Sequence, residues 1–294
     1  MEIRKLRYFL EAAREGNMTH AAERLHVTQP TLSKQIKELE TELGKKLFIR
    51  GNFSVSLTPE GMLLRDRAED LLSIADRIEN EFKTMDQVTG GKINIGCAES
   101  YLIEYLALAV KSLNPKYPGI TYSITSGGTE QVAEKLENGV MDLAIIVESP
   151  DLERYHYIEI PQTDRWGVYM PKDCPLAKKE NIYPEDLIGY PLFCSEQSLR
   201  SDMPRWAGET LDKLNFIANF NLANNSLVFT RAGVGLSLSF ENIVELTDSS
   251  SLVFKPLYPE LHNKMYVIWK KYQVFSPAAK LLIEEIKNII ENRP

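Results

Sequence analysis

Short polar side chains and one lysine gather between residues 29 and 34, in the segment TQPTLSKQIKELE that begins at Thr28. The amide of Gln29 can pair bidentately with adenine, and Lys34 can reach guanine or a phosphate. Thr31 can offer a methyl group to thymine, and Ser33 is adaptable in its hydrogen bonding. Such chemistry is typical of base recognition in the major groove of DNA. It requires a rigid element that presents these side chains together.

The same segment predicts a helix that could be this element. Thr28 is a favourable N-cap, and Pro30 falls in the first turn, where its missing N–H costs nothing. A helical wheel separates the apolar from the polar positions, with Leu32, Ile36 and Leu39 on one side and Pro30, Thr31, Lys34 and Lys37 on the other. A short helix over about 19–25 precedes it, so we expect a helix-turn-helix whose second helix packs by one face and reads DNA with the other.

Further helical and turn signals surround this pair. An apolar stripe over residues 6–13 predicts a first helix that ends at Gly16. The recognition helix should run to about Glu42 before Gly44, and residues 47–57 alternate around Gly51 like a small hairpin. We therefore assign residues 1–58 to a winged helix-turn-helix DNA-binding domain.

Residues 59–88 predict one long helix with a narrow apolar seam. The seam follows heptad spacing through Leu64, Ala68, Leu71, Ala75, Ile78, Phe82 and Met85. A seam this narrow needs a partner helix. Packing on the chain's own C-terminal domain is one alternative; we favour homodimerisation, because a polar-flanked helix between two domains has little of its own chain to cover it. Residues 59–89 are assigned as a linker and dimerisation helix.

Beyond Gly90-Gly91 the pattern changes to alternating strands and helices. Expected strands are 93–97, 120–125, 143–147, 166–170, 191–193, 216–220, 235–239 and 265–269, and expected helices are 101–113, 129–137 and 276–292. The first five elements form a βαβαβ unit and hence a parallel sheet. We expect a 90–294 effector-binding domain of two α/β lobes, the first over about 90–161 and 266–294 and the second over about 162–265.

Two-lobed α/β domains bind small molecules between the lobes, where helix N-termini face the carboxyl ends of strands. Ser100 and Thr129 would cap such helices and offer hydroxyl and N–H groups to a polar ligand, a carboxylate among the candidates. The alternative is that each merely caps its own helix. Glu99 and Glu196 could line the same cleft, which keeps an ammonium-bearing or polyhydroxylated ligand open. The expected effector residues are Ser100, Tyr101, Ser126, Gly127, Thr129, Glu148, Cys194 and Asn221.

Composition narrows the class of protein. Residues 1–60 hold ten Lys and Arg against eight Asp and Glu, which gives them a net charge of +2. Because the whole chain has a net charge of −7, the remaining residues carry −9. A mildly basic head on an acidic body fits local phosphate binding. No apolar run suits a membrane span or a signal peptide, and the three cysteines lack metal spacing, so we expect a cytoplasmic protein with reduced thiols and without metal or cofactor.

The segment AAERLHVTQPTLSKQIKELETELGKKLFIR, followed by LTPEG, resembles the N-terminal signature of the LysR-type transcriptional regulators. NPKYPGI, ENGVMDLAI and RAGVGLSL extend the resemblance along the chain. It implies a bacterial regulator, commonly a homotetramer, with a winged helix-turn-helix, a linker helix and a two-lobed effector domain that resembles type 2 periplasmic binding proteins. It also implies DNA contacts at Gln29, Pro30, Thr31, Ser33, Lys34, Arg50 and Thr58. The expected wing, residues 51–56, departs from the family in carrying no charge, which should lower the salt dependence of DNA binding.

Two other classes of protein are alternatives. An enzyme on the same scaffold would use Cys97 or Cys194 with His156 or His262, but no nucleophile motif, metal spacing or phosphate-binding glycine loop accompanies them. A simple solute-binding protein would leave residues 1–58 and the heptad seam unexplained. DNA affinity separates the regulator from both, so we expect no catalytic residues and a double-stranded operator as partner.

Overall fold

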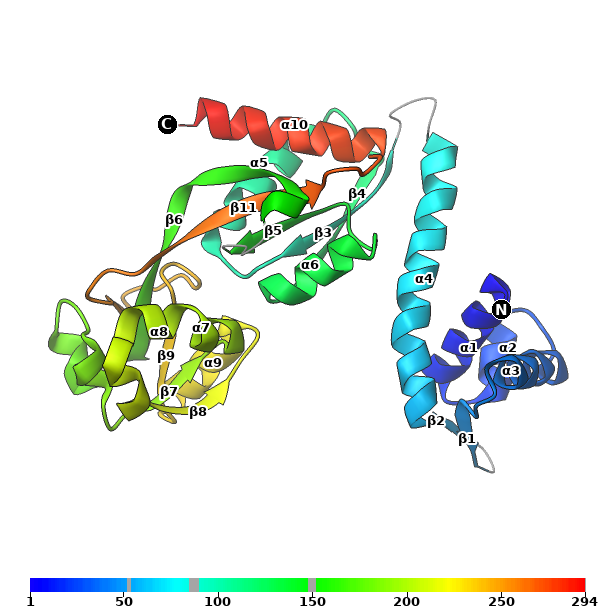
Figure 1. Cartoon of the computed structure of the whole chain (residues 1–294), viewed down its shortest axis with the longest axis horizontal. Coiled ribbons are helices and arrows are strands. Elements are labelled where there is room, and N and C mark those ends of the chain that lie inside the picture. Colours follow the sequence, from blue (N-terminus) through cyan, green and yellow to red (C-terminus); the bar gives the residue numbers. More distant parts are fainter. Residues whose placement is uncertain (52–53, 85–89, 148–151, 294) are drawn as a thin grey trace. The chain divides into compact units, whose positions relative to one another are not determined.

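The computed structural model describes residues 1–51, 54–84, 90–147 and 152–293. It divides into two compact units, Met1–Lys83 and Thr84–Pro294, which are described separately (Figure 1). The first unit contains α1 (Ile3–Glu15), α2 (Met18–Arg24), α3 (Gln29–Leu43), β1 (Phe48–Arg50), β2 (Val55–Leu57) and α4 (Pro59–Thr84). The predicted helix-turn-helix and hairpin are therefore confirmed.

Local sequence signals set the ends of these helices. Gly16 and Gly44 end α1 and α3 in the left-handed conformation, with φ of 59° and 66°. The Asn17 side chain accepts hydrogen bonds from the first turn of α2, and the Thr28 hydroxyl accepts one from the N–H of Thr31. The three helices and the hairpin enclose one core, which includes Leu6, Phe9, Ala21, Leu32, Ile36, Leu39 and Leu47.

The start of α4 belongs to this core. Gly61 lies against the residue that precedes β1, where an added Cβ would be 2.2 Å from the carbonyl oxygen of Leu47. Ala68 and Leu72 are buried among the side chains of the helix-turn-helix. The seam predicted over residues 64–85 is therefore divided: its first part packs on the unit's own core, whereas Leu71, Ile78 and Phe82 are exposed. Met85 lies outside the described residues.

In the second unit, the first lobe is built on a parallel sheet. β3 (Gly91–Cys97) pairs in parallel with β4 (Ile120–Ser126) and with β5 (Leu143–Val147), as predicted. β11 (His262–Lys270) adds on antiparallel to β5. The 3₁₀ turn η1 (Tyr101–Ile103), α5 (Glu104–Leu113), α6 (Thr129–Glu137) and α10 (Pro277–Asn292) cover this sheet. Residues on β5 alternate between a core shared with α5 and α10 and one shared with α6.

The long strand β6 (Tyr155–Pro171) connects the lobes (Figure 1). Its first part pairs with β11, and from Trp166 onward it pairs with β9 (Leu236–Phe240) and β10 (Leu252–Pro256). The second lobe also contains β7 (Pro191–Cys194), β8 (Asn215–Asn219), α7 (Glu196–Arg200), α8 (Asp202–Ala207) and α9 (Ala223–Arg231), together with short 3₁₀ turns at 175–178, 184–187 and 208–213. The sequence predicts that the chain passes from the first lobe to the second near Pro161. In the structure this passage is made by the continuous strand β6, which contains Pro161. β6 and β11 are the two strands through which the chain passes between the lobes.

Candidate functional site

The two faces of α3 have opposite environments. Leu32, Ile36 and Leu39 have no exposed surface, whereas Gln29, Pro30, Thr31 and Lys34 are exposed. The prediction of one packed and one free face is therefore confirmed. The free face begins at the helix N-terminus, and the positive end of the helix dipole there favours anions such as phosphate.

Two of the predicted DNA-contacting residues meet at the junction of α3 and the hairpin. Nη1 of Arg50, on β1, donates to Oγ of Ser33 at 3.3 Å. Lys34 is 76% exposed, with its ammonium 4.0 Å from a carboxylate oxygen of Glu38. Arg50 and Lys34 thus place positive charge at the exposed surface of α3 and the adjoining strand.

The hydroxyl of Thr58 makes two hydrogen bonds within the N-terminal unit. Its hydroxyl donates to the carbonyl of Lys46 at 2.7 Å and accepts from the N–H of Gly61 at 2.9 Å. This hydroxyl therefore caps α4 and joins it to β1. A DNA contact by Thr58 stays a prediction, and its hydroxyl also serves this junction.

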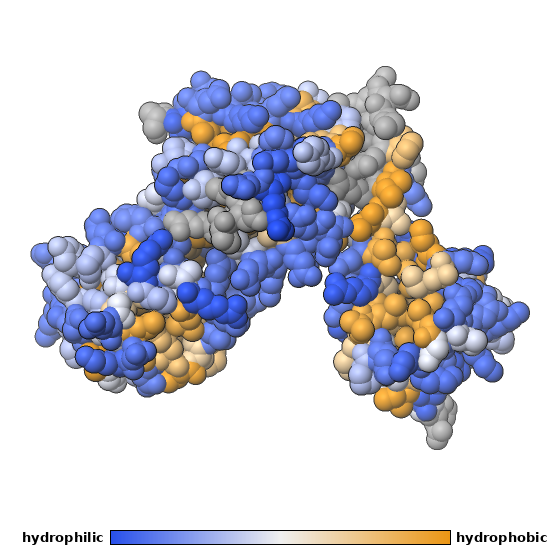
Figure 2. All heavy atoms as spheres, in the orientation of Figure 1, coloured by the Kyte–Doolittle hydropathy of each residue, from blue (hydrophilic) through white to orange (hydrophobic). Residues whose placement is uncertain are grey.

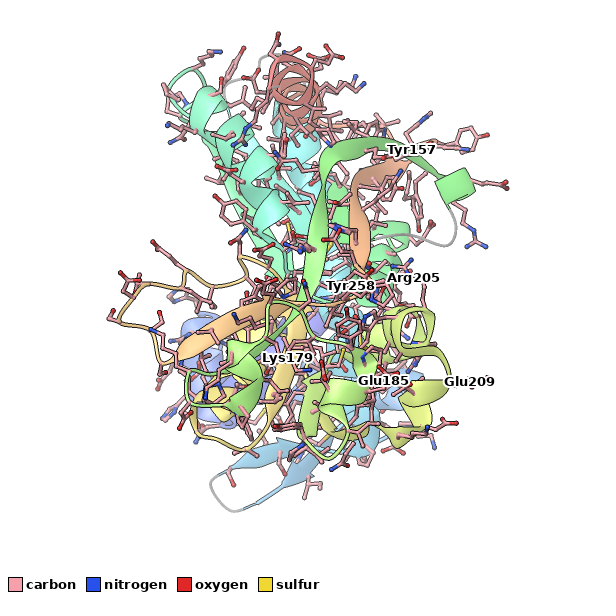
Figure 3. All side chains as sticks on the ribbon, turned by 90° about the vertical axis from the view of Figure 1, so that its left-hand side faces the viewer. Tyr157, Lys179, Glu185, Arg205, Glu209 and Tyr258 are labelled. Atoms are coloured by element: carbon pink, nitrogen blue, oxygen red, sulfur yellow. The ribbon has the colours of Figure 1, made fainter. Side chains whose placement is uncertain are left out.

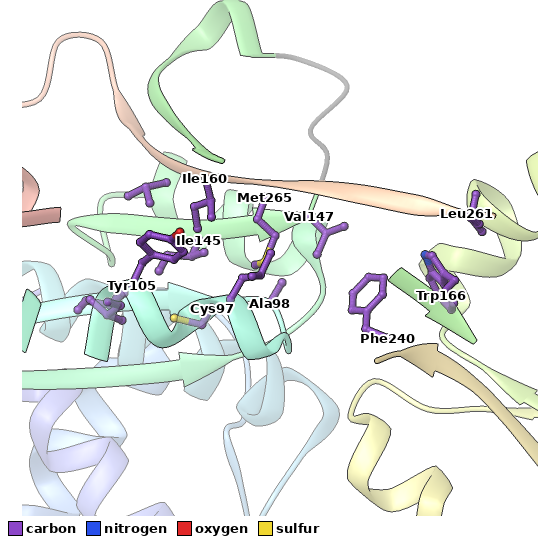
Figure 4. Close-up of a cluster of buried hydrophobic side chains, with 14 of the residues drawn as sticks. Cys97, Ala98, Tyr105, Ile145, Val147, Ile160, Trp166, Phe240, Leu261 and Met265 are labelled. Atoms are coloured by element: carbon purple, nitrogen blue, oxygen red, sulfur yellow. The ribbon is translucent and has the colours of Figure 1, made fainter. Parts of the chain in front are cut away.

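In the second unit, a cavity of about 500 Å³ lies between the lobes. Side chains from both lobes line it, and its floor includes Trp166 and Phe240, whose ring centroids are 4.7 Å apart. Figure 4 shows these two rings on one side of a buried cluster, with Ala98 and Val147 on the other. The described lining is Ala98, Glu99, Gly127–Glu130, Gln131, Val147, Trp166, Cys194–Ser198, Arg200, Asp202, Asn219–Asn221, Ala223, Ser226 and Leu238–Phe240.

The structure gathers only part of the predicted effector set at this cavity. The lining includes Gly127, Thr129, Cys194 and Asn221, whereas Ser100, Tyr101 and Ser126 are outside it. Glu148 lies outside the described residues. Ser100 is buried instead: its hydroxyl accepts from the N–H of Leu102 and donates to Oδ1 of Asp164, both at 2.9 Å. This hydroxyl is therefore used within the protein, and Tyr101 is exposed on the surface.

Thr129 does not cap α6 as predicted. Gly128 is the N-cap, and Thr129 is the first helical residue. Its hydroxyl donates to the carbonyl of Val147 at 2.9 Å, and its N–H donates to Oε1 of Gln197, in the opposite lobe, at 3.0 Å. The N-terminus of α6 thus receives a side chain from the other lobe.

A reciprocal contact runs the other way. The carboxylate of Glu99, in the first lobe, accepts a hydrogen bond from the N–H of Ala223, at the start of α9 in the second. Sequence reasoning placed Glu99 at the cleft but missed Gln197, which has no recognisable motif. Each lobe therefore supplies one acceptor to a helix N-terminus of its partner across the cavity.

The two cysteines named as possible nucleophiles are poorly suited to reaction. Burial raises the pKa of the Cys97 thiol to about 12 and also raises the pKa of Cys194. The thiolate is the reactive form, so both groups are unreactive near neutral pH. His262 hydrogen-bonds to Thr163, and His156 lies beside Trp269, so neither histidine is placed here as a base for these thiols.

None of the helices described has both the length and the apolar character to cross a membrane. Among the same residues, no three His, Cys, Asp or Glu side chains come together in a way that could hold a metal ion.

Comparison with known proteins covers both units. Residues 3–62 match the model for the bacterial regulatory helix-turn-helix protein of the lysR family, and residues 86–289 match that for the LysR substrate binding domain. The Hca operon transcriptional activator HcaR of Escherichia coli is 27% identical over 292 residues, which is 95% of each chain. Full-length CbnR complexed with its target DNA has a TM-score of 0.73 at 20% identity, covering 98% of this chain and 99% of that one. Full-length BenM has a TM-score of 0.55 at 25% identity, covering 99% of this chain and 97% of that one.

Proposed function

The chain belongs to the LysR family of bacterial transcriptional regulators, and we propose that it reads its operator with the exposed face of α3 while the cavity between the lobes of its second unit binds the controlling small molecule. It is a sequence-specific DNA-binding regulator with an effector-binding domain. We place it in the cytoplasm, where its DNA is, and assign it no catalytic reaction.

The observation that carries this proposal is the sidedness of α3. Its apolar face is fully buried, while Gln29, Thr31 and Lys34 are exposed and the guanidinium of Arg50 donates to Ser33 on the same helix. An amide, a hydroxyl and an ammonium on one rigid helix, with a guanidinium on the adjoining strand, suit base edges and the flanking phosphates. We propose Gln29, Pro30, Thr31, Ser33, Lys34 and Arg50 as the DNA contacts.

A gel-shift selection on fragments of the source genome tests this function. The full-length protein should retain a small subset of fragments at 150 mM salt in the presence of excess nonspecific DNA, because base contacts add to the salt-sensitive phosphate term. Retention of no fragment, or equal retention of all fragments, would overturn the proposal. A parallel assay with residues 90–294 alone should show no shift.

We further propose that the exposed part of α4 forms a homodimer, and that dimers pair into a tetramer. Figure 2 shows apolar side chains along α4. Leu71, Ile78 and Phe82 are 47%, 51% and 71% exposed. Exposed apolar side chains at heptad spacing are stabilised by a second helix.

The substitution Ile78→Glu is expected to separate the dimer, because a glutamate in an apolar helix seam loses solvation without gaining a partner. Size-exclusion chromatography with light scattering should show the assembly mass halved at micromolar concentration. Arg65→Glu is the matched control, since Arg65 is 46% exposed and lies about 140° around the helix from Ile78. Equal masses for both variants would show that this seam does not hold the dimer.

A further inference from the structure

The charges that line the cavity are unequal. The described lining carries four carboxylates and one guanidinium, namely Glu99, Glu130, Glu196, Asp202 and Arg200. Arg200 is already shared, because it pairs with Glu196 and lies 3.9 Å from a carboxylate oxygen of Glu130. A ligand carboxylate would therefore enter a cavity whose described lining offers it no uncommitted cation.

The helix termini that would attract an anion are also engaged. Gln197 accepts from the first helical N–H of α6, and the carboxylate of Glu99 accepts from that of α9. Because a helix N-terminus favours negative charge, Glu99 there acts as an internal carboxylate. An anionic effector would have to displace it, whereas a cation would be attracted to it.

A buried carboxylate outside the described lining, near Trp166 in the sequence, adds to the negative charge of this domain. Asp164 and Trp166 are two residues apart on β6, so their side chains project to the same face of the strand. Asp164 is 4% exposed; Oδ1 accepts from Ser100, and Oδ2 has no partner among the described residues. Burial raises the pKa of Asp164 to about 6, and the hydrogen bond from Ser100 partly offsets this increase. A buried acceptor without a donor is costly.

The floor of the cavity supplies the complementary apolar surface. Trp166 and Phe240 pack edge to face, and Phe220 also contributes to the lining. Aromatic faces attract cations as well as apolar groups, and Trp does so most strongly. The volume of about 500 Å³ falls within the range of small-metabolite pockets.

We propose that the effector is an organic cation: an amine or amidine on an apolar body, with its charged group facing Glu99 and its body against Trp166 and Phe240. This inference rests on the proposed function, since it names the chemical class of the ligand for the same cavity. Glu99 is then the residue that determines charge selectivity.

The test is a thermal-shift and calorimetry series on the full-length protein. The probes present phenylethyl, indolylethyl and 3-methylbutyl bodies, each as the primary amine, the amino acid, the alcohol and the carboxylate. The amines should raise the Tm, with at least about tenfold tighter Kd than the matching carboxylates, and the amino acids should bind more weakly than the amines. Carboxylates binding more tightly than amines, or no amine raising the Tm, overturns the proposal.

Glu99→Gln gives the second arm of this test. A glutamine keeps an acceptor for the N–H of Ala223 but removes the charge, so amine affinity should fall by about tenfold while carboxylate affinity rises. Glu209→Gln is the control, because Glu209 is exposed and outside the described lining (Figure 3). An unchanged ratio of amine to carboxylate affinity in Glu99→Gln contradicts the assignment of Glu99.

Operator binding by the ligand-free wild type is measured in the same preparation. If that binding is present but the charge preference is reversed, only the ligand class is wrong. If operator binding is absent, the proposed function fails whichever probes bind.

Discussion

Replacing Gln29 and Lys34 together with alanine should weaken binding to the selected operator by on the order of 10²- to 10³-fold, because each lost base contact costs about 1–3 kcal/mol. Both residues are exposed on α3, and alanine is a better helix former than either. The Tm of the N-terminal unit should therefore change by less than about 2 °C. Fluorescence anisotropy with a labelled operator and a thermal melt measure the two effects.

The single variants separate the two kinds of contact. Gln29→Ala should reduce affinity for the operator but leave nonspecific affinity nearly unchanged, since its amide reads a base edge. If Lys34 contacts a phosphate, Lys34→Ala should weaken both operator binding and nonspecific binding. It should also lower the slope of log affinity against log salt concentration by about one. Lys280→Ala, at an exposed site on α10, is the control for lost positive charge. A melting temperature that falls with operator affinity would instead assign these side chains to folding.

Local sequence signals predicted the DNA-reading unit well because its helices are defined by nearby residues. Thr28 and Gly44 bound α3 in the sequence and in the structure, and the spacing of Leu32 and Ile36 identifies the buried face. The hairpin follows from Gly51 and the alternation around it. Each of these signals acts within a few residues, so one sequence is sufficient to read it.

The division of the α4 seam was not predictable in this way. Heptad spacing shows that Ala68 and Ile78 share a stripe, but it does not show that the helix-turn-helix covers Ala68 and leaves Ile78 exposed. That difference depends on the angle at which α4 leaves the hairpin. Gly61 sets the close approach at this point through a contact with Leu47, fourteen positions earlier in the chain.

The cavity shows the same limit more strongly. The position of the cavity was predicted correctly, because helix N-termini at the ends of strands do gather there. The roles of the individual residues were not predicted. The contact between Glu99 and Ala223 joins residues 124 positions apart, and that between Gln197 and Thr129 joins residues 68 apart. Ser100 was expected in the lining, yet Asp164 on the crossing strand binds its hydroxyl. Such pairings depend on how two lobes meet, which local patterns do not encode.

Glu40→Ala should destabilise the N-terminal unit by about 3 kcal/mol, which lowers its Tm by more than about 10 °C. Glu40 is 4% exposed at the end of α3, and Oε1 accepts from the N–H of Leu47 at 2.9 Å and of Phe48 at 3.4 Å. Its other oxygen accepts from Nζ of Lys46 at 3.1 Å. Alanine would leave buried N–H groups of β1 without acceptors. Thermal melts of residues 1–83 followed by circular dichroism measure the loss.

The charge of Glu40 gives this stability a direction with pH. Desolvation, the largest contribution, raises the pKa of Glu40, but the hydrogen bonds from Leu47, Lys46 and Phe48 outweigh it and the pKa is lowered. A lowered pKa in the folded state means that the stabilisation is fully present above the unfolded value of about 4.5 and is lost as the pH falls through the folded value.

Glu40→Gln separates charge from hydrogen bonding. Its amide oxygen can still accept from Leu47, so its loss at pH 7 should be smaller than that of alanine, and its Tm should decline less than wild type below pH 4.5. Lys5 also lowers the pKa of Glu42, so the pH dependence of the wild-type Tm contains contributions from both glutamates. The difference in Tm between wild type and Glu40→Gln at each pH contains the contribution of Glu40 alone. A difference that stays constant from pH 7 to pH 3 would show that the hydrogen bonds of Glu40, and not its charge, join α3 to the hairpin.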